Sequence, residues 1–184
     1  MSITERKRDV DGFLARLNGE SPRARILLEA GFLEELLRSA IRQRLANNTS
    51  SDDLFGGTSS LGLVVLAKHA HSLGLIGKRE LDAMRGFAKA RNKIAHSWRA
   101  DFTDLEIQKI AASIQYIKLV GEATMADHQR CFARLDYLGL YLTEELGNRF
   151  AGMPPTIYDG GIFTTSLSVH ADTGRHEIKT GSDS

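Results

Sequence analysis

The sequence predicts an all-α protein, a compact bundle of about six helices followed by a polar C-terminal tail. Two observations lead to this prediction. No proline interrupts the span from Arg23 to Met153, and apolar residues recur at helical spacing through nearly all of it. After Gly152 the chain becomes rich in Thr, Ser and Gly. We therefore expect one helical domain over residues 1–152 and a tail over residues 153–184.

Turn and capping residues mark the first two helices. The first is expected over Thr4–Leu17 and ends at Asn18-Gly19. Ser21 suits an N-cap, with Pro22 at the first position of a second helix that runs to about Leu45. The apolar stripe of this second helix is so wide that we expect it to be the central helix, packed on two sides.

Four more helices follow the polar loop 47–60. Their expected limits come from caps, stops and apolar periodicity. The third is capped by Ser59 or Ser60 and stopped by Gly74, and Thr103 caps the fifth. The expected ranges are Leu61–Leu73, about Lys78–Trp98, Thr103 through Ile117, and about Ala126–Phe150.

The tail allows two interpretations. Apolar residues alternate weakly along Ile162–Val169, which suits a short strand or a hairpin around Asp159-Gly160-Gly161. The other interpretation is a flexible tail.

Composition limits the classes of function. The formal net charge is +1, so the surface as a whole is not built to bind a polyanion or a polycation. The chain has one cysteine, Cys131, so an intrachain disulfide and an all-cysteine zinc site are excluded. We interpret Cys131 as a small core residue. The charged start lacks a signal sequence, and the longest apolar run, Leu61–Ala67, is too short to span a membrane. We expect a cytoplasmic protein without membrane contact.

One stretch near the end of the fourth helix could perform chemistry. Arg91 and His96 are five residues apart, about 140° around a helix and about 7.5 Å along it, so long side chains can converge. Asn92 and His96 are four apart and share a face. A guanidinium can hold a phosphodiester, and an imidazole can transfer a proton near neutral pH. With the RNA 2′-OH as nucleophile, no metal or other cofactor is needed.

The charge around these residues is positive. Between Lys78 and Arg99 there are seven basic and two acidic residues, a formal +5. The candidate nucleic-acid-binding residues are Arg85, Lys89, Lys93 and Arg99. Trp98 and Phe102 are either a base-stacking platform or core or interface anchors.

A purely structural interpretation is equally open. Arg91 would pair with a core carboxylate, Asn92 would bind backbone, and His96 would cap the helix end, where its charge favours the dipole. Other candidate sites are weaker: His69 and His71 point apart on their helix, and His128 with Cys131 supplies too few ligands for zinc.

The hexapeptide from Arg91 to His96 resembles the Arg-x4-His motif of the HEPN superfamily. That resemblance implies an all-helical fold and a metal-independent endoribonuclease that acts as a homodimer. Arg91, Asn92 and His96 would be its catalytic residues.

A longer resemblance spans roughly Leu28 to Ile107 and is to the mannitol operon repressor-like family. It implies transcription regulation, and since no helix-turn-helix with a basic recognition helix is evident, action through a protein partner. The matching pieces are Leu54-Phe55-Gly56, Ser60-Leu61-Gly62, Ser72-Leu73-Gly74-Leu75-Ile76, Arg91-Asn92, Ala95-His96 and Phe102. The sequence thus leaves two functions: a regulatory protein that binds a partner, and a ribonuclease.

Overall fold

The computed structural model describes residues 3–45, 61–97, 100–119, 122–152, 166–169 and 176–179, with the side chains of residues 3–7 and of the last two segments excepted. Six α-helices make up this part of the chain, together with one 3₁₀ turn and two short strands, so the all-α prediction is confirmed. The helices are α1 (Ile3–Leu17), α2 (Pro22–Arg44), α4 (Leu63–Ser72), α5 (Lys78–His96), α6 (Leu105–Ser113) and α7 (Asp127–Ala151), and the 3₁₀ turn η1 is Glu122–Thr124.

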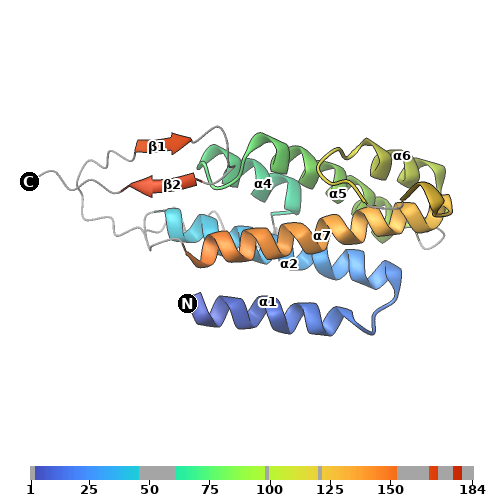
Figure 1. Cartoon of the computed structure of the whole chain (residues 1–184), viewed down its shortest axis with the longest axis horizontal. Coiled ribbons are helices and arrows are strands. Elements are labelled where there is room, and N and C mark those ends of the chain that lie inside the picture. Colours follow the sequence, from blue (N-terminus) through green and yellow to red (C-terminus); the bar gives the residue numbers. More distant parts are fainter. Residues whose placement is uncertain are drawn as a thin grey trace, which may run out of the picture.

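Two long helices organise the bundle. α2 packs against α7 and α4, and α7 also contacts α1, α5 and α6 (Figure 1). Leu33, Leu37 and Ile41 of α2 are completely buried, as are Leu135, Leu138 and Leu142 of α7. The predicted role of the second helix as the central helix is therefore confirmed.

Local signals explain several helix ends. The Ser21 hydroxyl accepts from Ala24 N at 3.3 Å, and Pro22 begins α2 as predicted. α4 stops where Gly74 takes a left-handed conformation, with φ of 69°. The buried side chains of Leu75 and Ile76 then secure the turn against the core.

Several predicted helix boundaries are displaced in the structure. α5 ends at His96 rather than Trp98, because Ser97 is extended. α6 is capped by Asp104, whose carboxylate accepts from the backbone N of Glu106 and of Ile107. Thr103 instead donates to Asp101. α6 also ends at Ser113, so the apolar repeat up to Ile117 continues beyond the helix as extended chain that packs on the core.

α4 begins two residues later than predicted. Its N-cap is Gly62, and Ser59 and Ser60 lie outside the described residues. The loop 47–60, including Leu54-Phe55-Gly56, also lies outside them.

Two strands occur in the tail, β1 (Ser166–Val169) and β2 (His176–Lys179). They pair antiparallel with Leu167 opposite Ile178. β1 falls within Ile162–Val169, where a short strand or hairpin is one of the two interpretations of the tail. The predicted hairpin centre, 159–161, lies outside the described residues.

Candidate functional site

One exposed face of α5 carries polar side chains along its whole length. Its members follow the heptad-like spacing that keeps residues on one face of a helix. All are exposed, whereas Met84, Phe87 and Ile94 on the opposite face are buried. We call this face the α5 ridge; it consists of Lys78, Asp82, Arg85, Lys89, Asn92 and His96.

Arg91 lies beside the α5 ridge and is turned toward α2. Its Nη2 lies 2.5 Å from Oε1 of Glu34, and the exposed fractions of the two side chains are 25% and 18%. The same Glu34 oxygen accepts from Leu63 N at 3.0 Å. A carboxylate is favourable at this point because the first N–H groups of α4 have no partner within the helix. The Arg91–Glu34 pair therefore ties α5, α2 and the start of α4 together.

Asn92 and Arg91 are joined directly. Arg91 Nη1 donates to the Asn92 side-chain oxygen at 2.9 Å. Asn92 thus binds a side chain, whereas the structural interpretation of the sequence expected it to bind backbone. Together Glu34 and Asn92 engage both terminal nitrogens of the Arg91 guanidinium.

His96 is the last residue of α5 and is exposed. Its imidazole makes no hydrogen bond or ion pair with any residue that the structure describes. The structure therefore places the three predicted catalytic residues on one helix end, and hydrogen bonding joins Arg91 to Asn92 but neither of them to His96.

The chain after His96 is held by a residue that the sequence analysis did not identify. Arg23 Nη1 donates to the carbonyl oxygens of Ser97 and Ala100, both at 3.1 Å. Both acceptors follow the end of α5: Ser97 is its C-cap, and Ala100, whose backbone N donates to the Ser97 oxygen at 3.2 Å, lies three residues further on. The contact spans more than 70 residues of sequence, and no local pattern marks it.

Most basic residues of this stretch already have carboxylate partners. Lys78 and Arg85 both pair with Asp82, and Lys93 pairs with Glu106, which raises the pKa of Lys93. Glu34 and Glu106, which pair with α5 from other parts of the chain, thus offset part of the formal +5 of the stretch.

Of the three predicted nucleic-acid-binding residues that the structure describes, Lys89 has the most accessible charge. Its side chain is exposed and has no ion-pair partner among the described residues. Arg85 and Lys93 each form an ion pair with a carboxylate. Arg99 lies outside the described residues, as does Trp98. The role of these four residues in binding nucleic acid stays a prediction.

Phe102 is a core anchor. It packs on the buried core, and its ring meets that of Phe132 edge-on, with ring centroids 5.2 Å apart. Aromatic pairs favour this geometry inside proteins. Of the roles open to Phe102, that of a core anchor is the one the structure shows.

Two of the remaining residues considered from sequence, Cys131 and His71, have structural surroundings. Cys131 is buried, as predicted, and burial raises the pKa of its thiol to about 11. His71 Nδ1 lies 3.0 Å from the carbonyl oxygen of Ile76. Within the described ranges, no group of three or more His, Cys, Asp or Glu side chains could hold a metal ion. None of the described helices is both long and apolar enough to cross a membrane.

Comparisons with known proteins do not assign the chain to a family. No family model matches the chain, and no curated protein and no solved structure shows significant similarity to it. The resemblances to the HEPN superfamily and to the mannitol operon repressor-like family therefore stay predictions.

Proposed function

We propose that this protein is a non-enzymatic regulator that acts by binding another protein. One observation carries the proposal: the Arg91 guanidinium is engaged by Glu34 and Asn92. A ribonuclease would need that guanidinium to hold phosphate. Taking it from Glu34 would leave a part-buried carboxylate without its cation, which is costly.

The α5 ridge is the surface we assign to the partner. Its C-terminal half presents Lys89, Asn92 and His96, which are exposed. Of these three side chains, only Asn92 is hydrogen-bonded to another side chain among the described residues. The charge of Lys89 is balanced by no described carboxylate. A protein surface with carboxylates complements this half of the α5 ridge. Such charge complementarity orients the two proteins and raises their rate of association. This fits the regulatory role that the mannitol operon repressor-like resemblance implies.

The test compares ridge variants as bait in lysate of the native host. Lys89→Glu combined with His96→Ala should lose a partner that the wild type retains, and the host transcripts that respond to wild-type expression should no longer respond. Arg16→Glu is the matched control, because it also reverses a charge on an exposed helical position, on α1. A partner retained equally by all three proteins, or transcripts that respond to none of them, would contradict the proposal.

The second candidate function is a metal-independent endoribonuclease, which one observation favours. His96 is exposed and unpaired within the described part, so its imidazole is available for proton transfer. In this alternative a second copy of the chain would complete the site, and Arg91 would exchange Glu34 for phosphate.

Incubation with single-stranded and structured RNA in EDTA separates the two functions. The regulator leaves RNA intact at every concentration. The ribonuclease cleaves it and loses cleavage on His96→Ala, while Glu34→Gln, which frees Arg91, increases it. Cleavage that is equal in the wild type and His96→Ala would indicate a contaminant.

A further inference from the structure

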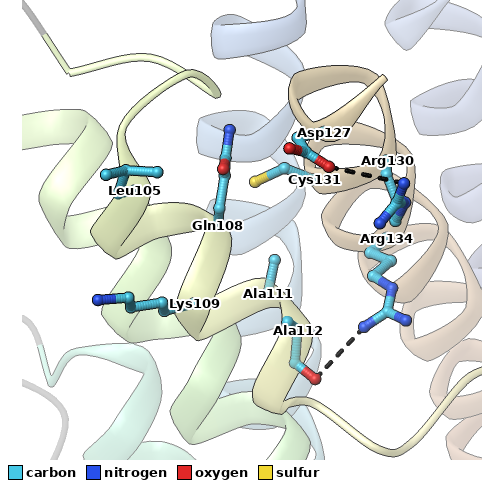
Figure 2. Close-up of a pocket in the computed structure, with 9 residues that line it drawn as sticks. All are labelled: Leu105, Gln108, Lys109, Ala111, Ala112, Asp127, Arg130, Cys131 and Arg134. Carbon is cyan, nitrogen blue, oxygen red and sulfur yellow. Dashed lines mark hydrogen bonds and ion pairs between the residues drawn. The ribbon is translucent and has the colours of Figure 1, made fainter. Parts of the chain in front are cut away.

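A cleft of about 300 Å³ lies between α6 and the first turns of α7, and no residue of the α5 ridge lines it. Its volume is at the lower end of those found for small-molecule sites. Figure 2 shows its two sides, with Ala111 and Ala112 on α6 and with Cys131, Arg130 and Arg134 on α7.

Arg134 is held rigidly at this cleft. Its Nε and Nη2 donate to the two carboxylate oxygens of Glu122 at 2.9 and 2.7 Å. Nη1 donates to the carbonyl oxygen of Ala112, on the opposite wall, at 3.3 Å (Figure 2). A guanidinium has five N–H groups, so two remain beyond these three bonds.

Arg130 is fixed by backbone. Its Nε donates to the carbonyl oxygen of Glu122 and its Nη2 to that of Met125, both at 2.9 Å. Asp127 lies 3.5 Å from the same Nη2. The other terminal nitrogen, Nη1, makes no bond with a described residue. Two preorganised guanidinium groups therefore retain unused donors, and a ligand need not order them.

The charge around the cleft limits how much negative charge a ligand can carry. Arg130 and Arg134 contribute two positive charges, and Asp127 and Glu122 balance them with two negative ones. Lys109 also lines the cleft, but Figure 2 shows its ammonium extending away from α7. A ligand is therefore recognised by the unused guanidinium N–H groups rather than by a surplus of positive charge, and a monoanion costs less to place there than a dianion.

The rest of the lining is apolar and small. Ala111 and Ala112 leave the space open, and Leu105, exposed by 70%, stands at its edge. Cys131 adds no charge at neutral pH because burial raises the pKa of its thiol to about 11. A ligand in this cleft would bury an apolar body against α6.

We propose that the cleft between α6 and α7 is a binding site for a small organic monoanion, a carboxylate on a short aliphatic body. The carboxylate binds the free N–H groups of Arg130 and Arg134, since a planar fork of donors matches a carboxylate. The aliphatic body lies against Ala111, Ala112 and Leu105. This site is independent of the function assigned to the α5 ridge.

The test uses hexanoate as probe and its neutral counterpart, hexanamide, as comparison. Titration of the full chain, followed by backbone amide NMR shifts, should give saturable changes for hexanoate at residues 108–112 and 130–134. Hexanamide should bind at least about tenfold more weakly, because it lacks the charge that strengthens hydrogen bonds to arginine. Inorganic phosphate should compete weakly or not at all.

Two variants locate the site. Arg130→Gln should weaken hexanoate at least about tenfold, and Ala112→Phe should abolish binding by filling the cleft while circular dichroism stays that of the wild type. Arg16→Gln, on α1, controls for loss of a surface charge. If Ala112→Phe does not fold, the affinities of Arg130→Gln and Arg130→Lys for hexanoate decide instead. Three results would overturn the proposal. The first is that hexanoate shows no saturable binding up to about 10 mM, which corresponds to a negligible affinity. The second is that hexanamide binds as tightly as hexanoate, and the third is that Arg130→Gln binds hexanoate as tightly as the wild type does.

Discussion

Glu29 of α2 and Gly139 of α7 face each other in the interface between these two helices. A Cβ atom built on Gly139 would lie 2.2 Å from Oε2 of Glu29 and 2.8 Å from its carboxyl carbon. The Glu29 side chain is completely buried, and neither of its oxygens accepts a hydrogen bond from a donor in the described residues. Gly139 thus supplies the space that a buried carboxyl group occupies.

Gly139→Ala should lower the free energy of unfolding by about 1–3 kcal/mol, the usual cost of overpacking a core. The gain in helix propensity, about 1 kcal/mol, offsets only part of this cost. Urea denaturation followed by circular dichroism measures it. Gly31→Ala is the matched control, because a Cβ there meets nothing within 4 Å and should stabilise α2. Equal stabilisation by both substitutions would contradict the packing argument.

The protonation of Glu29 should make stability depend on pH. Burial, with the nearby Asp136 carboxylate, raises the pKa of Glu29 to about 10 from an ordinary 4.5. Between these values folding takes up a proton, so the contribution of this group to stability is complete below pH 4.5 and is lost as pH rises toward 10. Arg25, which pairs with Asp136 at 2.6 Å, opposes the shift only partly.

Glu29→Gln should therefore gain stability relative to the wild type as pH rises from 5 to 9, since a neutral amide has no proton to take up. Chemical denaturation at three pH values across this range measures the difference. Thr143→Val is the control. It also removes a buried polar atom without a partner, the Thr143 hydroxyl, but it changes no titratable group in this pH range. A wild-type-to-Gln difference that does not change with pH would contradict the predicted protonation state.

The helices could be predicted because their signals are local. The Ser21-Pro22 start of α2 and the stop at Gly74 need only neighbouring residues, and both are confirmed. The end of α6 was missed because Ile114 and Ile117 keep an apolar spacing after the helix has ended. Burial of apolar residues in extended chain resembles helix periodicity when the segment is short.

The candidate site was only partly predictable. Helical spacing places Arg91, Asn92 and His96 at one helix end, but their partners come from elsewhere in the chain. Glu34 is 57 residues from Arg91, and Arg23 is 74 residues from Ser97. Such contacts depend on how α2 packs beside α5, and the spacing within one helix contains no information about that packing.

The Arg91–Glu34 pair should show energetic coupling in a double-mutant cycle. Arg91→Ala and Glu34→Ala should each destabilise the fold, and the double variant should lose less than the sum by about 1–2 kcal/mol. Glu34→Ala should cost more than Arg91→Ala, because Glu34 also accepts from Leu63 N at the start of α4. Strict additivity in denaturation experiments would mean that the pair contributes no stability.

Arg23→Gln should loosen the backbone next to His96. Arg23 Nη1 is the common donor to the carbonyl oxygens of Ser97 and Ala100, and a charged donor to such acceptors is worth about 1.5–3 kcal/mol. A shorter, neutral amide on α2 cannot reach both. Backbone NMR relaxation should therefore show lower order parameters around Ser97 and Ala100, with α5 itself unchanged. Arg16→Gln, on the surface of α1, should leave them as in the wild type. Unaltered order parameters in Arg23→Gln would show that packing of Ala100, which is buried, holds this segment without the guanidinium.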